Sequence, residues 1–354
     1  MKGFILFLVL SLSGSAWAIQ LEPILFGPEF NISKSATSTS IELVTERLVK
    51  HLIADQPPGS EFVFLEENSV GAKRNTLQSP NGWWFSWYPD GGIEFNMKPM
   101  TVAEYKRYKD DMQDAIFVTA GNEGYFPQLW RGGGHINIDM ANFKKHLLLL
   151  RNFVVDLWNH NELFMGIFNY DFQNAKPYEL GLTTNLKQVV AAMDKVIKDG
   201  GDFNALLAAH RYGLYGNSFN LCRDNEDRIE LRGVRPQASM DVWVRQISLL
   251  ESRIKYLATF DTLIPYKPRV PWDFDLQRNE YNPPIDPQEA LKSFYVYVDE
   301  SRQDWTDHRD YIWPQWTWNI DGQPSELEKF EATAWFKVRQ ARRKCEKFLG
   351  ATGW

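Results

Sequence analysis

Polar and apolar residues alternate along several short stretches in the first half of the chain. Residues 135–140 (HINIDM) alternate throughout, and residues 83–87 and 92–97 flank the turn signal Pro89-Asp90-Gly91. Alternation with a period of two is typical of a half-buried strand, and a turn signal between two such stretches indicates a hairpin. Stretches rich in strand formers predict further strands at residues 24–32, 61–65 and 227–233.

Other segments carry apolar residues at the spacing of a helix. Within residues 40–53, apolar side chains recur at Ile41, Val44, Leu48 and Leu52. Residues three and four apart lie on one face of a helix, so this pattern predicts an amphipathic helix. Comparable patterns predict helices at residues 142–161, 186–198 and 239–258.

The last third of the chain is helical, with one irregular stretch. Residues 264–287 are rich in Pro and aromatic side chains, which indicates a surface segment or a linker. Ser325 and Glu328 have the spacing of a capping box, which would open a helix running to residue 349. Strands followed by helices, without a marked boundary, predict an α+β fold. We therefore expect residues 19–354 to form a single domain, a mostly antiparallel sheet with helices packed on one side.

Residues 1–18 have the pattern of a secretory signal peptide. Lys2 gives a positive start, residues 4–12 are almost entirely apolar, and Ala16-Trp17-Ala18 is a small-x-small cleavage pattern. A membrane anchor would need about 20 apolar residues, roughly twice the length of this run. We therefore expect residues 1–18 to be removed and the protein to be periplasmic or secreted.

The charge of the chain argues against nucleic acid as a partner. The formal net charge is −6, and it becomes −7 when Lys2 is removed with the leader. Proteins that bind nucleic acid neutralise phosphates with a basic surface. No stretch after residue 18 is long and apolar enough to enter a membrane. Cys222 and Cys345 are the only cysteines, and they can equally form a disulfide in an oxidising compartment or remain buried thiols.

Four of the predicted strands carry an acid or a histidine where an apolar residue would be the default: Glu29, Glu94, His135 and Glu230. Taken singly, a strand glutamate is usually on the solvated face, and a histidine after glycines is usually a structural hydrogen-bonding residue. Taken together on one face, carboxylates and an imidazole form an oxygen-rich site for a hard divalent cation. We therefore predict a metal site from these four residues.

Arg228 and Arg232 lie two residues to either side of Glu230. Residues two apart in a strand point to the same side, so these three side chains would share a face while Ile229 and Leu231 face the core. Arg-x-Glu-x-Arg is also a common surface ladder of ion pairs. Next to a metal, however, such arginines suit phosphate or carboxylate, which a guanidinium binds bidentately.

The order of these motifs resembles the glutamine-synthetase-like superfamily of carboxylate–amine ligases, in particular its amidoligase and glutamate–cysteine ligase branches. Five segments between about residues 24 and 235 match the family pattern in sequence order. Asn31 stands where the family has a second acid, and Asn137 stands where it has a second histidine. The matching segments are Gly27-Pro28-Glu29-Phe30-Asn31, Ile93-Glu94-Phe95-Asn96-Met97-Lys98-Pro99, His135-Ile136-Asn137-Ile138-Asp139, Arg211-Tyr212 with Asn220-Leu221, and Glu230-Leu231-Arg232.

The resemblance implies ATP-dependent amide-bond formation. ATP would phosphorylate a carboxylate of a small molecule or peptide, and an amine would then displace the phosphate. Mg²⁺ or Mn²⁺ on Glu29, Glu94, His135 and Glu230 would neutralise phosphate oxygens. Arg232 would stabilise the transferred phosphoryl group, and Arg211 would orient the nucleotide or the substrate carboxylate, so that Arg232, Arg211 and Glu230 form the catalytic set. The resemblance implies further substrate or nucleotide contacts from Arg131, Gly133, Asn220 and Arg228.

Two alternatives belong to other classes of protein. The first is a secreted protein that binds a peptide or a cell-wall fragment on the same scaffold, which the substitutions at Asn31 and Asn137 and the tryptophans at 313, 316 and 318 favour. The second is a metal-dependent amide hydrolase that uses metal-activated water. A ligase requires ATP and forms ADP, a hydrolase requires metal without nucleotide, and a binding protein requires neither.

Overall fold

The computed structural model of the chain gives the fold of most of the predicted domain. It describes residues 19–34, 63–69, 72–78, 84–87, 92–127, 134–160, 180–210, 219–221, 228–231, 237–267, 273–275, 280–282, 286–312 and 314–348, with single positions 40, 43, 46, 47, 50 and 234. The predicted leader lies outside these residues. Among the described helices, none combines the length and the apolar character needed to cross a membrane.

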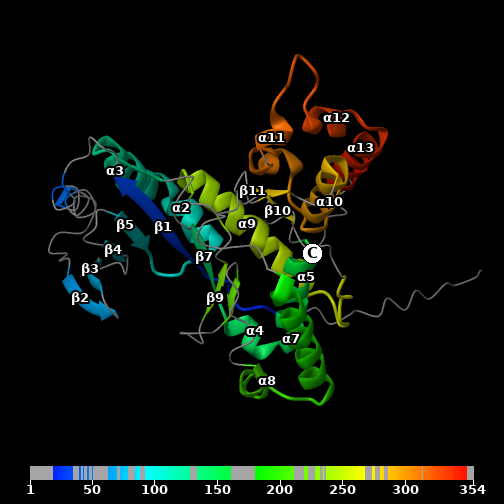
Figure 1. The fold of residues 1–354 in the computed structure, drawn as a ribbon, viewed down its shortest axis with the longest axis horizontal. Coiled ribbons are helices and arrows are strands. Elements are labelled where there is room, and N and C mark those ends of the chain that lie inside the picture. Colours follow the sequence, from blue (N-terminus) through cyan, green and yellow to red (C-terminus); the bar gives the residue numbers. More distant parts are fainter. Residues whose placement is uncertain are drawn as a thin grey trace, which may run out of the picture.

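A nine-stranded sheet, antiparallel at every pairing, runs from the left side of Figure 1 to its middle. The strands run in the order β2-β3-β4-β5-β1-β7-β9-β8, and β6 pairs with one end of β1. The predicted strands and the predicted hairpin are therefore confirmed. The strands are β1 (Phe26–Lys34), β2 (Val63–Ser69), β3 (Ala72–Gln78), β4 (Trp84–Trp87), β5 (Gly92–Asn96), β6 (Tyr125–Pro127), β7 (His135–Asp139), β8 (Phe219–Leu221) and β9 (Arg228–Leu231).

The alternation in the sequence divides the sheet into an apolar face and a polar face. Phe26, Phe30, Ile136, Ile138 and Ile229 are buried together on the apolar face. Their neighbours in the strands point the other way because successive side chains alternate across a strand. Burial of each large apolar side chain contributes about 1.5–3 kcal/mol, so the apolar face sets the register of the central strands.

Helices cover the apolar face, as the sequence predicts. In Figure 1, α2 (Val102–Met112) and α9 (Met240–Leu257) lie together beside β1. The ring of Trp243 on α9 contacts Phe30 and Tyr105, with centroids 5.5 and 5.4 Å apart. The Tyr105 hydroxyl donates to the Phe26 carbonyl oxygen at 3.0 Å. The α+β class and the position of the helices are therefore confirmed.

The structure has further helices, some of which extend this core while the C-terminal ones form a second cluster. They are η1 (Gln113–Val118), α3 (Thr119–Asn122), α4 (Ala141–Lys145), α5 (Leu147–Asn159), α7 (Leu180–Lys198), α8 (Phe203–His210), α10 (Pro287–Glu300), η2 (Trp305–Tyr311), α11 (Pro314–Thr317), α12 (Glu326–Ala332) and α13 (Ala334–Phe348).

Several predicted helix ends are correct because their capping residues act as expected. The Ser239 hydroxyl accepts from the backbone N–H of Val242 at the start of α9. Ser325 and Glu328 form the predicted reciprocal capping box at the start of α12. The helix expected at 186–198 ends correctly before Gly200, whose φ of +69° suits glycine, but it begins earlier, at Leu180.

Two helices predicted as continuous are broken. His146 leaves the helical region (φ −131°, ψ 81°), so the helix expected at 142–161 is divided into α4 and α5. Thr333 adopts an extended conformation (φ −63°, ψ 146°) between α12 and α13, and its hydroxyl accepts from the backbone N–H of Phe336. Threonine thus acts as an N-cap in the middle of an uninterrupted amphipathic pattern.

The first part of the 264–287 segment is hydrogen-bonded to side chains of α5. The side-chain oxygen of Asn152 accepts from the backbone N–H of Ile264 at 3.1 Å, and the side-chain amide of Asn159 donates to Pro265 O at 2.9 Å. These contacts confirm a surface segment that packs on a helix. Further along, β10 (Asp273–Asp275) and β11 (Glu280–Asn282) pair as a two-stranded ribbon, so the prediction of a wholly irregular segment is wrong.

The C-terminal helices form a second apolar cluster, at the upper right in Figure 1. Tyr295, Trp305, Phe330 and Phe336 pack ring against ring there, with centroids 5.1–6.3 Å apart. The 3₁₀ helix η2 buries His308 in this cluster with 1 % of its surface exposed.

A buried charge network joins the two clusters. The Arg253 guanidinium on α9 donates to both carboxylate oxygens of Asp156 on α5 and to Glu300 on α10, the last at 2.9 Å. Arg253 and Asp156 are 3 % and 2 % exposed. Cys345 is an exposed free thiol on α13, and Cys222 lies outside the described residues.

Candidate metal centre

Strand register brings three of the four predicted ligands together. Glu29 in β1 lies opposite His135 in β7. In the next pair of strands, Asn137 lies opposite Glu230 in β9. Residues directly opposite one another project from the same face of a sheet, so these side chains share the polar face. Residues about 100 positions apart in the sequence therefore meet on three adjacent strands.

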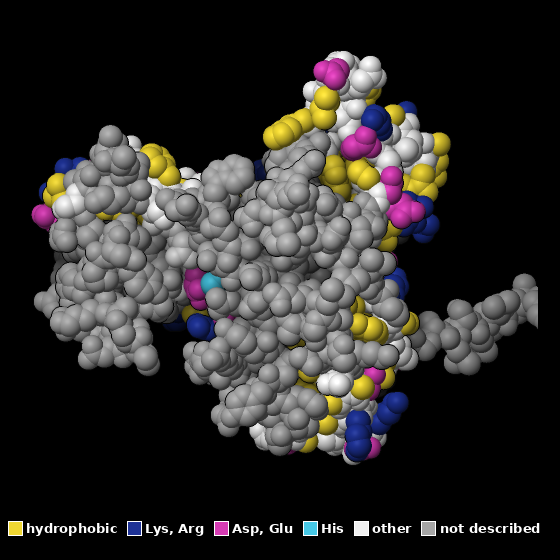
Figure 2. All heavy atoms as spheres, viewed as in Figure 1, with side chains coloured by type: hydrophobic (Ala, Val, Ile, Leu, Met, Phe, Trp, Pro, Cys, Tyr) yellow, Lys and Arg dark blue, Asp and Glu magenta, His cyan; other side chains and the backbone are white. Residues whose placement is uncertain are grey.

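The three side chains are in direct contact. Nδ1 of His135 is 2.7 Å from Oε2 of Glu29 and 3.0 Å from Oε1 of Glu230. One potential ligand atom from each residue lies within 4.8 Å of the others. Only 8–12 % of each side chain is exposed. Figure 2 shows a histidine against acidic side chains on this face of the molecule, over the region where Figure 1 places β7 and β9.

The charges of the cluster shift its pKa values in opposite directions. Burial lowers the pKa of His135, but hydrogen bonds to Glu230 and Glu29 and their charges outweigh burial and raise it to about 9. Burial raises the pKa of Glu29, but the contacts with His135 outweigh it and leave this pKa below the usual value. The positively charged, protonated imidazole therefore compensates the negative charges of the two buried carboxylates.

Asn137 fixes the orientation of Glu29. Its Nδ2 donates to Oε1 of Glu29 at 3.0 Å and to the Gly27 carbonyl oxygen at 3.3 Å. Oδ1 of Asn137 and Nε2 of His135 are buried and have no hydrogen-bond partner among the described residues. Buried polar atoms are normally satisfied, so two such atoms beside two carboxylates indicate a polar ligand or an ion.

The donor set fits a divalent cation. Two carboxylates and one imidazole supply oxygen and nitrogen ligands of the kind that Mg²⁺ and Mn²⁺ accept. Without a metal, the protonated imidazole of His135 supplies the positive charge beside the two carboxylates. A metal ion would compete with this proton, since only the neutral imidazole is a ligand.

The fourth predicted ligand, Glu94, lies on the neighbouring strand β5. Its backbone pairs with Asn31, and the next residue on the same face of that strand, Asn96, pairs with Glu29. Glu94 is therefore placed on the polar face, one strand away from the cluster, while its side chain lies outside the described part. Asn96 is buried on the same face, and sequence reasoning missed it.

The predicted binding residues divide into those placed near the cluster and those outside the described residues. Asn220 in β8 lies opposite Glu230 in register. Arg228 shares the face of Glu230, lies opposite Asp139, and is exposed, while Ile229 and Leu231 are buried as predicted. Outside the described residues are Arg131, Gly133, Arg211 and Arg232.

Asn137 has a role that the sequence did not indicate. Compared with the family pattern, it was interpreted as the loss of a ligand. The structure shows that it holds Glu29 in place, at the centre of the alternating stretch HINID. The sequence did carry a signal, an asparagine inside a predicted strand. A buried side-chain amide usually has a specific hydrogen-bond partner.

Comparison with known proteins gives distant structural similarities. No model of a protein family matches the chain, and no curated protein matches it either. Apo GmaS without ligand is similar at TM-score 0.42 and 12 % identity, over 89 % of this chain and 72 % of that one. A GmaS/ADP complex gives 0.43 and 12 %, over 90 % and 73 %. The complex between the prokaryotic ubiquitin-like protein Pup and its ligase PafA gives 0.30 and 11 %, over 67 % and 46 %. All three TM-scores lie below 0.5.

Proposed function

We propose that this protein is an exported, divalent-metal-dependent enzyme of the carboxylate–amine ligase type. The observation that carries the proposal is the contact of Glu29, His135 and Glu230 on the polar face of the central sheet. Three ionisable side chains from three strands are nearly buried here. Apolar residues at such positions would often stabilise the fold as well or better, so stability alone does not explain these three residues. The motifs that resemble the ligase superfamily are the same motifs that place these residues.

Glu29, His135 and Glu230 would hold the cation, and Asn137 would keep Glu29 oriented toward it. When bound, the cation would stabilise negative charge on phosphate or carboxylate oxygens. The low exposure of the cluster strengthens such interactions, since water screens charges less effectively there. Hydrogen bonds to a ligand carboxylate typically set its geometry, so Asn137 is a positioning residue in this scheme.

The remaining roles follow from the resemblance and are part of the proposal. Arg232 would stabilise the transferred phosphoryl group and Arg211 would orient ATP or a substrate carboxylate. Arg228, on the face of Glu230, would contact the substrate, which we take to be a small molecule or peptide with a carboxylate. Export is proposed from the leader pattern at residues 1–18.

Thermal unfolding of the purified protein with and without ligands tests this proposal. We expect Mg²⁺ or Mn²⁺ together with ATP to stabilise the wild type, and a ligand present at 100 times its dissociation constant adds about 2.7 kcal/mol. Glu230→Gln should lose the ligand-dependent shift. Glu289→Gln, which alters an exposed glutamate on α10, should keep it.

The outcomes separate the three classes of function. Stabilisation by metal and ATP, with ADP formed in the presence of an acceptor amine, supports the ligase. Stabilisation by metal alone, with amide cleavage, would replace it by the hydrolase. No stabilisation of a well-folded wild type by any of these ligands would refute the proposal and leave the binding protein on this scaffold.

A further inference from the structure

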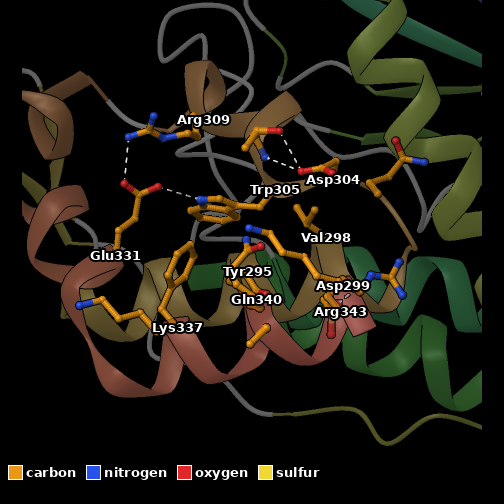
Figure 3. A pocket seen from close by; sticks show the side chains of 15 residues that line it. Tyr295, Val298, Asp299, Asp304, Trp305, Arg309, Glu331, Lys337, Gln340 and Arg343 are labelled. Carbon is orange, nitrogen blue, oxygen red and sulfur yellow. Dashed lines mark hydrogen bonds and ion pairs between the residues drawn. The ribbon is translucent and has the colours of Figure 1, made fainter. Parts of the chain in front are cut away.

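The C-terminal helices enclose a cavity that shares no lining residue with the Glu29–His135–Glu230 cluster. Its volume is about 600 Å³, within the range of about 300–1,000 Å³ that small-molecule sites occupy. The cavity lies between α10, η2 and α13 (Figure 3). Its floor is apolar and aromatic, formed by Tyr295, Val298, Trp305 and Phe336, each at most 9 % exposed.

The acidic groups of this cavity are already bound within the protein. Glu331 accepts from Nε1 of Trp305 with one oxygen and from Arg309 with the other, at 3.1 and 2.9 Å. Asp304 accepts from the backbone and hydroxyl of Thr306 at the start of η2. Figure 3 draws both sets of contacts around the indole of Trp305. Arg309 therefore neutralises the charge of Glu331, and Asp304 is held at the start of η2.

The wall formed by α13 is basic. Lys337, Gln340, Ala341 and Lys344 line the cavity at positions i, i+3, i+4 and i+7, which form one face of a helix. Both lysines are exposed, and neither forms an ion pair with a carboxylate of a described residue. Ala341 leaves space between them above the aromatic floor.

An adjoining hollow adds to the positive charge. It measures about 240 Å³ and shares Asp299 and Arg343 with the larger cavity. Asp299 is the ion-pair partner of both Arg339 and Arg343, at 3.6 and 3.3 Å. Glu300, also in this hollow, is bound to the buried Arg253. Glu346 lines the hollow too and pairs with Arg342 and Arg343 at 2.9 and 3.8 Å. The hollow thus has four guanidiniums against three carboxylates, one of which is bound to Arg253, so the potential on this side of the cavity favours an anion.

We propose that this cavity is a binding site for an anionic small molecule with a flat apolar body. The body would lie on the aromatic floor around Trp305, and the acid group would meet the lysines of α13. Aromatic surfaces supply most of the binding energy of such sites, and a few charged groups select the ligand. The site is independent of the metal centre and of the reaction proposed for it.

Calorimetric titration of the purified protein with a matched pair of probes tests this inference. The probes are 2-naphthoate and its neutral counterpart 2-naphthylmethanol, which have the same ring system. We expect the anion to bind about tenfold more tightly, since each of the two exposed lysines can form a weak ion pair with its carboxylate. The preference should disappear in the double variant Lys337→Gln/Lys344→Gln, with the affinity for the alcohol unchanged.

Two further variants separate the site from a general effect of charge. Ala341→Trp fills the cavity and should abolish binding of both probes. Lys106→Gln/Lys198→Gln removes two exposed lysines on α2 and α7 and should bind both probes as the wild type does. Equal binding of the two probes, no binding of naphthoate at about 1 mM, or an unchanged preference in the Lys337/Lys344 variant would each overturn the proposal.

Discussion

His135 and His308 are both largely withdrawn from water, one on the polar face of the sheet and the other in the core of the C-terminal helices. His135 contacts two carboxylates at 2.7 and 3.0 Å. His308 lies against the Phe294 ring, with centroids 6.4 Å apart, and the charge of Arg245 affects its pKa more than the opposing charge of Asp304 does. The same side chain is thus placed in two opposite electrostatic environments.

The pKa values of the two histidines move in opposite directions. Carboxylates overcome burial and raise the pKa of His135 to about 9, whereas burial, reinforced by Arg245, lowers the pKa of His308 to about 4. Burial alone therefore does not mark a functional histidine. The neighbouring charges distinguish the two histidines: His135 is the one that a cation or proton can occupy, while His308 packs against Phe294.

The largest loss of stability is expected when the buried ion pair between Arg253 and Asp156 is broken. Asp156→Ala leaves the buried guanidinium of Arg253 with one partner, Glu300, instead of two. Breaking a buried ion pair in this way costs about 3–5 kcal/mol, to be measured by urea denaturation. Asp199→Ala, which removes an exposed ion pair with Lys195, should leave stability nearly unchanged. If the two variants unfold at the same urea concentration, Arg253 does not couple the regions.

His135 should make the metal-free protein less stable as the pH rises. Its folded pKa is raised above the unfolded value of 6.5, so its contribution is complete below pH 6.5 and is lost as the pH approaches about 9. The loss amounts to about 3 kcal/mol at most. Urea denaturation with a chelator between pH 6 and 9.5 should show this slope in the wild type and a flatter one in His135→Gln. Equal slopes would refute the raised pKa.

His308, in contrast, should make the protein less stable as the pH falls. Its folded pKa is depressed, so its contribution is complete above pH 6.5 and is lost as the pH falls toward about 4. The other acidic groups titrate equally in both proteins, so the informative quantity is the difference between wild type and His308→Gln. We expect this difference to shift by about 3 kcal/mol at most between pH 7 and 4. A constant difference would show that His308 can be protonated without cost.

The smallest effect concerns the orientation of Glu29. Asn137→Ala removes the hydrogen bond to Oε1 of Glu29, and loss of such a partner typically lowers metal affinity 10- to 100-fold. Mn²⁺ titration measures this effect. Asn142→Ala is a matched control, because it also removes hydrogen bonds of a buried asparagine, those to the backbone of Glu22, but lies away from the metal site. Equal Mn²⁺ affinity in the two variants would mean that Asn137 only supports the sheet.

The alternation of residues 135–140 and the strand formers of residues 24–32 and 227–233 were sufficient to predict these strands, and the period of two predicted the faces of Ile229 and Glu230. Local patterns could not give the pairing of β1 with β7 and of β7 with β9, which brings Glu29, His135 and Glu230 together. The resemblance to a family supplied that grouping. The breaks at His146 and Thr333 were missed because the apolar pattern continues through both. The burial of His308 depends on aromatic residues from several helices and leaves no local signal.

Calorimetric titration with Mn²⁺ across pH tests the metal centre most directly. We predict one high-affinity site per chain whose affinity rises by up to about tenfold per pH unit between pH 7 and 9, because the metal displaces the proton of His135. Glu29→Gln and Glu230→Gln should each weaken binding strongly, and Glu289→Gln should not. A wild-type affinity that is independent of pH, or that survives in Glu29→Gln and Glu230→Gln, would contradict a metal site on these three strands.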